Sequence, residues 1–229
     1  CLPLPDTVLP KTFECMAKQF LDQIIRKSKS MGVISQIHIV FDRYFPGSVK
    51  SQRRDVRSTG KASHKYLVKG DATLPQGISW KDFLSVPENK ASLARHYTEY
   101  ITKQGSSFTQ GLCIYISGGQ DEDCKQITTS IQSVPAWESN VEEADSRMIL
   151  HALLASRENA NVVVHSPDTD VLVLLIYHKK IFESGKLLFK TGRVVKGVNN
   201  VRYISVDDIV LSLGREKTDI LMAIYALSG

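Results

Sequence analysis

Helical patterns and short apolar runs alternate along this chain, and this alternation constrains the fold more than any other feature of the sequence. Between residues 11 and 32, apolar residues recur every three or four positions, which predicts a helix that ends near Gly32. The same reading predicts further helices at 87–103 and 141–156, and short buried strands at 36–41, 112–117 and 161–166. Such alternation favours an α/β fold with a doubly wound, mostly parallel twisted sheet.

The C-terminal part of the chain has a different pattern. Residues 186–214 predict a β-hairpin, with Asn199-Asn200 near its turn, followed by a helix. A chain of 229 residues with 42% hydrophobic content can bury one sizeable core, so we expect a single domain over residues 1–229. The longest apolar run, Val171 to Tyr177, is far shorter than the roughly 20 residues of a membrane span. We therefore expect neither a membrane-spanning nor a secreted protein.

Acidic side chains stand where two predicted strands end and where one predicted helix begins. Asp42 follows the strand at 36–41, and Asp168 and Asp170 follow the strand at 161–166. The stretch "VEEAD" adds three more carboxylates, Glu142, Glu143 and Asp145. Side chains at the carboxyl ends of parallel strands converge on one edge of the sheet, where ligands bind. Crowded carboxylates repel one another unless a cation is bound, and oxygen ligands suit Mg²⁺ or Mn²⁺.

Local structure alone offers a second interpretation of each acidic residue. Ser139 with Glu142, or Asn140 with Glu143, forms a plausible helix capping box. Asp168 fits a tight turn or a helix N-cap, and an aspartate such as Asp42 often follows a strand as a turn residue. The metal interpretation therefore rests on the three acidic sites taken together.

Three stretches of the chain resemble, in the same order, segments of the PIN-like superfamily that includes the XPG and flap endonucleases. The first, "IVFDRYFPGSVKSQRRDVR", is similar to that family's hydrophobic strand, Phe-Asp-Gly, proline and Lys/Arg-rich helix. The second, "EEADSRMILHALLA" followed by "VVVHSPDTDVLVLL", resembles its Glu-Ala-Glu-Ala helix, strand and Asp-x-Asp. The third, "DIVLSLGREKTDILMAIYALSG", resembles its helix and the apolar run into a Gly-x-Asp. Together they span most of residues 36–229, and they are most similar to a divergent animal branch of the superfamily.

The resemblance implies a Rossmann-like fold and a set of metal-binding, catalytic carboxylates, namely Asp42, Glu143, Asp145, Asp168 and Asp170. In the family, such carboxylates hold two divalent ions, which activate a water and stabilise the charge on the scissile phosphate. The implied activity is metal-dependent cleavage of single-stranded or flapped nucleic acid. The four cysteines show neither a C-x-x-C pair nor zinc-ligand spacing, which favours reduced thiols in a nuclear or cytoplasmic protein. The chain departs from the family at Arg43, where the family has glycine. The family's first-strand aspartate and Gly-x-Asp carboxylate fall outside the chain.

A basic segment lies between about residues 48 and 75. Its cations recur at steps of three or four, but Ser58-Thr59-Gly60 interrupts the helical pattern, so we expect a mobile basic flap. The candidate contacts to nucleic acid are Lys50, Arg53, Arg54, Arg57, Lys61 and Lys65. Contacts to a phosphate backbone need positive charge but no base code. The alternative is a solvated surface face, whereas in flap endonucleases the corresponding region forms an arch over single-stranded substrate.

Three other functions fit parts of the pattern. A PIN-like module without catalysis would bind nucleic acid or a protein partner, and Arg43 favours it. A glycosyltransferase also holds a metal-nucleotide with Asp-x-Asp after an apolar strand, but "EEAD" and the basic flap have no role there. A haloacid-dehalogenase-type phosphatase carries Asp-x-Asp on its first strand, whereas here the pair follows residue 160. We therefore expect a nuclease, with the non-catalytic module as the alternative.

Overall fold

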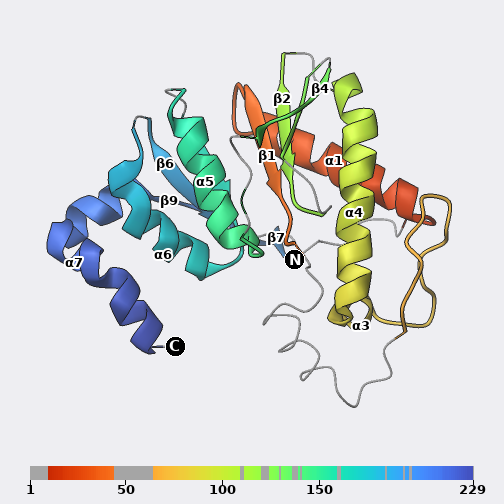
Figure 1. Ribbon diagram of the computed structural model, residues 1–229. Helices are drawn as coiled ribbons and strands as arrows, with labels where there is room; N and C mark the ends of the chain where they lie inside the picture. The colour runs from red at the N-terminus through yellow and green to blue at the C-terminus, as the bar shows by residue number, and fades with distance from the viewer. Residues whose placement is uncertain are drawn as a thin grey trace. The chain divides into compact units, whose positions relative to one another are not determined.

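The computed structural model describes residues 10–43, 64–108, 111–119, 124–128, 130–135, 139, 141–158, 161–183, 185–192, 194–195 and 198–228. The chain divides into two compact units, residues 2–144 and residues 145–229. Figure 1 labels many of the helices and strands of both units. The expectation of a single domain over residues 1–229 stays a prediction.

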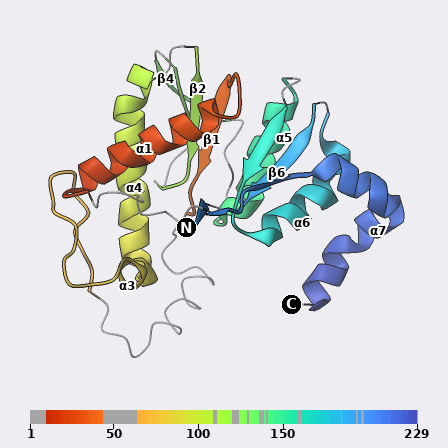
Figure 2. The same cartoon turned by 180° about the vertical axis from the view of Figure 1, so that it is seen from behind.

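The first unit contains the helices that the sequence pattern predicts at residues 11–32 and 87–103. Helix α1 (Phe13–Lys29) begins after Thr12, whose side chain accepts a hydrogen bond from the backbone N of Cys15 at 3.3 Å. Helix α4 (Pro87–Gln104) has proline in its first turn, where a missing N–H costs nothing. The short helices α3 (Trp80–Ser85) and η1 (Gly105–Phe108) flank α4 along the chain. Figure 2 shows α1 crossing α4, and the two helices pack against each other.

The sheet of the first unit has four strands in the order β1-β2-β3-β4. They are β1 (Gln36–Val40), β2 (Cys113–Ser117), β3 (Lys125–Ile127) and β4 (Ile131–Ser133). Strands β1 and β2 are parallel, with Ile37 opposite Ile114 and Ile39 opposite Ile116. The pairs β2–β3 and β3–β4 are antiparallel.

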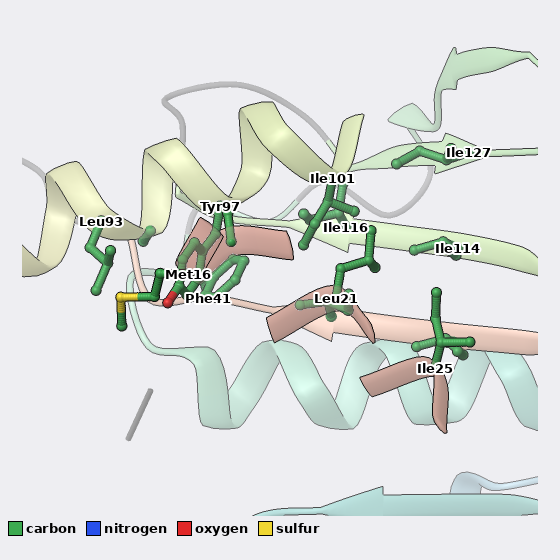
Figure 3. Packing of buried hydrophobic residues seen from close by; sticks show 14 of the residues in the cluster. Met16, Leu21, Ile25, Phe41, Leu93, Tyr97, Ile101, Ile114, Ile116 and Ile127 are labelled. Atoms are coloured by element: carbon green, nitrogen blue, oxygen red, sulfur yellow. The ribbon is translucent and has the colours of Figure 1, made fainter. Parts of the chain in front are cut away.

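The core of the first unit lies between this sheet and helices α1 and α4. Figure 3 shows the cluster, in which Leu21 of α1, Tyr97 and Ile101 of α4, and Ile114 and Ile116 of β2 are almost completely buried. These are positions that the helical and strand periodicities predict to face inward. Burial of this apolar surface is the main force that holds the unit together.

The second unit begins in α5 (Ala144–Ser156) and continues through β5 (Val162–His165), α6 (Thr169–His178) and η3 (Lys179–Ile181). It then forms β6 (Leu187–Thr191), β7 (Val194–Val195), β8 (Val198–Asn199), β9 (Arg202–Ser205) and α7 (Val206–Ser228). The sheet order is β5-β6-β9, in which β5 and β6 are parallel and β6 and β9 are antiparallel. Val171, Leu175, Phe189 and Val206 form the centre of its core.

The predicted hairpin is present, and Asn199 lies near its turn as expected. Strands β7 and β8 pair antiparallel, with Val194 opposite Asn199 and Val195 opposite Val198. The Asn199 side chain accepts a hydrogen bond from the backbone N of Val201 at 3.0 Å, which bends the chain between β8 and β9. Across this bend lies Gly192, at φ 82°, where an added Cβ would come within 2.0 Å of the carbonyl oxygen of Asn200.

The mixed α/β class is confirmed, but the described strands form a four-stranded and a three-stranded sheet with a separate two-stranded hairpin. Parallel pairing occurs at β1–β2 and β5–β6, and the other described pairs are antiparallel. The expectation of a mostly parallel sheet is thus wrong for these strands. The connections from β2 to β3 and from β3 to β4 are shorter than the dozen residues that a parallel crossover needs. Within the described ranges, no helix is long and apolar enough to cross a membrane.

Candidate carboxylate site

Asp42 lies just beyond β1 and is fixed by the start of α5. Its Oδ1 accepts a hydrogen bond from the backbone N of Ala144 at 3.0 Å. Ala144 is the first residue of α5, so the Asp42 carboxylate satisfies one of the amide groups that a helix leaves unpaired at its N-terminus. The side chain thus caps a helix that lies far along the chain from β1.

Arg43 reinforces the same connection. Its backbone N donates to the carbonyl oxygen of Glu142 at 2.9 Å, and its Nη1 donates to the carbonyl oxygen of Ser139. The residue is buried, with 7% of its surface exposed. Arg43, which stands where the resembling family has glycine, therefore fastens the segment before α5 to the end of β1.

The acidic stretch before α5 differs from the expected capping box. Helix α5 begins at Ala144, so Glu142 and Glu143 precede it and only Asp145 lies in its first turn. The Ser139 hydroxyl accepts from the backbone N of Val141 at 3.2 Å, which forms a local turn. The Ser139–Glu142 box is therefore wrong, because the capping oxygen comes from Asp42 instead. Asn140, of the other suggested box, lies outside the described residues.

Asp168 and Asp170 occupy the N-terminus of α6, directly after β5. Asp168 is the N-cap residue, and its Oδ1 accepts from the backbone N of Asp170 at 3.0 Å. The backbone N of Asp168 donates to the hydroxyl of buried Ser166 at 3.0 Å, and the backbone N of Ser166 donates to the carbonyl oxygen of Lys190 on β6. Of the two local interpretations of Asp168, the helix cap is confirmed.

The Asp170 carboxylate has a partner from the far end of the unit. Tyr225 on α7 donates its hydroxyl hydrogen to Oδ1 of Asp170. This hydrogen bond to the carboxylate raises the pKa of the Tyr225 phenol, because loss of the proton would break the bond and place two negative charges together. The sequence does not predict the contact between Tyr225 and Asp170, because the two residues lie 55 positions apart. It shows only that Tyr225 lies on an apolar helix.

One oxygen of each of these three aspartates is held by a hydrogen bond. Oδ1 is the acceptor in Asp42, Asp168 and Asp170 alike. Ligating carboxylates in metal sites are commonly oriented in this way by outer partners. Hard carboxylate oxygens are also the donors that Mg²⁺ and Mn²⁺ prefer, so the chemistry of Asp168 and Asp170 fits such an ion.

The five predicted ligands divide between the two compact units. Asp42 and Glu143 belong to residues 2–144, whereas Asp145, Asp168 and Asp170 belong to residues 145–229. In the part of the chain that the structure describes, no three or more His, Cys, Asp or Glu side chains form a group that could hold a metal ion. The shared acidic pocket of Asp42 and Asp168 stays a prediction.

Helix α5 buries two basic side chains one turn apart. Arg147 and His151 are 1% and 2% exposed. Burial, together with the nearby Arg147 charge, lowers the pKa of His151 to about 4, because both oppose a second positive charge in this place. His151 is therefore neutral near pH 7 and belongs to the buried interior of its unit.

Five of the six predicted nucleic-acid contacts, Lys50, Arg53, Arg54, Arg57 and Lys61, lie outside the described residues. Lys65 is described, and its Nζ pairs with Oε1 of Glu88 at 2.5 Å. Just after it, the backbone N of Tyr66 donates to the side chain of Asn89, and Gly70 and Ala72 accept hydrogen bonds from the start of α1. Residues 66–72 thus contact α1 and α4 within the first unit, and the expected mobile flap over about residues 48–75 stays a prediction.

Comparison with protein-family models gave no match. Neither the curated proteins nor the solved structures contain a significant match to this chain.

Proposed function

We propose that this chain is a divalent-metal-dependent nuclease domain of the PIN-like type. In this proposal it cleaves phosphodiester bonds of single-stranded or flapped nucleic acid, with Mg²⁺ or Mn²⁺ as the cofactor. The observation that carries the proposal is the pair Asp168 and Asp170. Both lie at the N-terminus of α6, immediately beyond a strand of a parallel pair, and each has one oxygen held in place.

The positions of these carboxylates suit an ion at that end of the strand. In open α/β sheets, ligands bind beyond the carboxyl ends of the strands. With Oδ1 of each aspartate held, Oδ2 is the oxygen that each would present to a cation, because within the described residues Oδ2 of Asp168 and Asp170 accepts no hydrogen bond. When bound, divalent ions in such a site activate water and neutralise charge on the phosphate. Asp42, Glu143 and Asp145 are the further ligands that the resemblance implies.

The protein's own part in this reaction is to hold the carboxylates and the nucleic acid. The turn made by Ser166 and the cap made by Asp168 fix the start of α6 and hold the Asp168 carboxylate in one orientation. Lys50, Arg53, Arg54, Arg57, Lys61 and Lys65 are the proposed contacts to phosphates, which would bind the strand without reading its sequence.

A non-catalytic module that binds nucleic acid or a protein partner is the second candidate. It is favoured by the caps that Asp42 and Asp168 make, because helix capping explains both aspartates without a metal. Buried Arg43, which replaces the family's glycine, also has a structural role in the bond to Ser139.

Cleavage of labelled oligonucleotides separates the two candidates. Single-stranded and flapped DNA and RNA are incubated with the protein in Mn²⁺, in Mg²⁺ and in EDTA. We expect metal-dependent cleavage that is lost in Asp170→Asn and retained in Glu216→Gln, a change at an exposed carboxylate on α7. Binding of the oligonucleotides without cleavage in either metal would favour the non-catalytic module.

A further inference from the structure

Tyr225 links the last helix of the second unit to the predicted cation ligands. It lies on the part of α7 that follows Gly214, where φ 74° and ψ 166° break the helix into two segments. The Thr218 hydroxyl donates to the carbonyl oxygen of Gly214 at 2.8 Å, which steadies the start of the second segment. Helices α6 and α7 pack against each other, so the ring of Tyr225 reaches the N-terminus of α6.

The Tyr225 hydroxyl has two partners in the first turn of α6. It donates to Oδ1 of Asp170, and it accepts a hydrogen bond from the side chain of Thr169. A tyrosine hydroxyl can donate one hydrogen bond and can also accept hydrogen bonds. Because its single hydrogen is donated to the Asp170 carboxylate, the hydroxyl cannot donate to any other group. The phenol is thereby oriented, and it orients Asp170 in turn.

Without this contact, Asp170 would be a solvent-exposed side chain in the first turn of a helix. Such a side chain samples several rotamers. Binding of a ligand then costs the conformational entropy that is lost when one rotamer is selected. A hydrogen bond from a neutral donor to a carboxylate is stronger than one between two neutral groups. Tyr225 therefore selects one orientation of Asp170 and leaves Oδ2 as the oxygen for a ligand.

We propose that Tyr225 is a positioning residue, which holds the Asp170 carboxylate ready to bind a divalent cation. The proposal rests on the function proposed above for Asp168 and Asp170. It adds a residue that touches neither the cation nor the nucleic acid. Outer partners of ligating carboxylates commonly change metal affinity by about 10- to 100-fold when they are removed.

Titration of the protein with Mn²⁺, followed by electron paramagnetic resonance of the free ion, tests this role. Tyr225→Phe keeps the ring and removes the hydroxyl, and we expect it to weaken Mn²⁺ binding about tenfold. Tyr203→Phe is the matched control, because Tyr203 is an exposed tyrosine of the same unit on β9, and we expect it to leave the affinity unchanged. In an Asp170→Asn background, the Tyr225→Phe change should have no further effect.

The outcomes distinguish this inference from the proposed function. Mn²⁺ binding by the wild-type protein that Tyr225→Phe leaves unchanged would overturn the positioning role and leave the metal site standing. Tighter binding in Tyr225→Phe would also overturn it, because the hydroxyl would then compete with the ion for Asp170. Absence of Mn²⁺ binding in the wild-type protein would contradict the proposed function, and the positioning role with it.

Discussion

Oδ1 of Asp42 accepts a hydrogen bond from the backbone N of Ala144 at 3.0 Å, although the two residues are 102 positions apart in the chain. Asp42, two residues beyond the end of β1 at Val40, thus supplies the capping oxygen of α5. A carboxylate at a helix N-terminus also interacts favourably with the helix dipole. Asp42 is therefore a structural residue as well as a predicted metal ligand.

The capping role predicts different effects for two substitutions at Asp42. Asp42→Ala removes the oxygen and should lower the free energy of unfolding by about 0.5–2 kcal/mol. Asp42→Asn keeps a side-chain oxygen that can accept from Ala144 and should cost less. Urea denaturation of the two variants measures the difference, and an equal loss in both would argue against the cap.

Arg43 gives a second prediction about stability. Arg43→Met keeps the aliphatic bulk but removes the hydrogen bond to Ser139, and it should lower the free energy of unfolding by about 1–3 kcal/mol. Arg95→Met is the control, because Arg95 is an exposed arginine on α4 and its loss should change stability by no more than about 0.5 kcal/mol. Denaturation curves that coincide for the two variants would mean that Arg43 does not fasten the segment before α5.

The pKa of His151, lowered to about 4, predicts how stability changes with pH. The unfolded chain binds a proton at this histidine near pH 6.5, whereas the folded chain does so only near pH 4. The contribution of neutral His151 to the free energy of unfolding is therefore fully present above about pH 6.5. As the pH falls from about 6.5 to 4, this contribution is lost, with a slope of up to about 1.4 kcal/mol per pH unit.

His151→Gln should flatten that part of the pH profile, because glutamine does not titrate. His165→Gln provides the comparison, since His165 is an exposed histidine at the end of β5. Chemical denaturation at several pH values between 7 and 4.5 measures the slope. A slope that His151→Gln leaves unchanged would be incompatible with a buried, neutral His151.

The basic segment carries a prediction about nucleic acid. Replacing Arg53, Arg54 and Arg57 by Glu should weaken binding to all sequences alike, and it should reduce the salt dependence because fewer counterions are released. Fluorescence anisotropy at several salt concentrations measures both effects. Binding curves that are unchanged by the charge reversal would identify the segment as a solvated surface.

Much of the secondary structure follows from local patterns in the sequence. Apolar periodicity predicts α1 and α4, and the apolar runs predict β1, β2 and β5, because burial imposes the same spacing on any chain. The pairing of the strands is harder to predict from the sequence. Short connections make β2–β3 and β3–β4 antiparallel, but the alternation of elements alone had favoured parallel neighbours.

The details of the candidate site depend on contacts between distant residues. Ser139 and Glu142 have the spacing of a capping box, yet Asp42 supplies the oxygen from another part of the chain. Tyr225 reaches Asp170 only because α7 folds back on α6. A local pattern contains no information about such partners, so the sequence predicts the acidic residues but not what holds them.

The proposed function requires that Asp168 and Asp170 bind a divalent ion. Asp168→Asn tests it cleanly, because asparagine caps a helix about as well as aspartate and the fold of α6 should be preserved. The most direct measurement is the anomalous difference map of crystals soaked in Mn²⁺, for the wild-type protein and for this variant. We expect a peak within coordination distance of Asp168 and Asp170 in the wild-type protein and none in Asp168→Asn. A wild-type map without a peak at these carboxylates, or a peak of equal height in the variant, would contradict binding of the ion by Asp168 and Asp170.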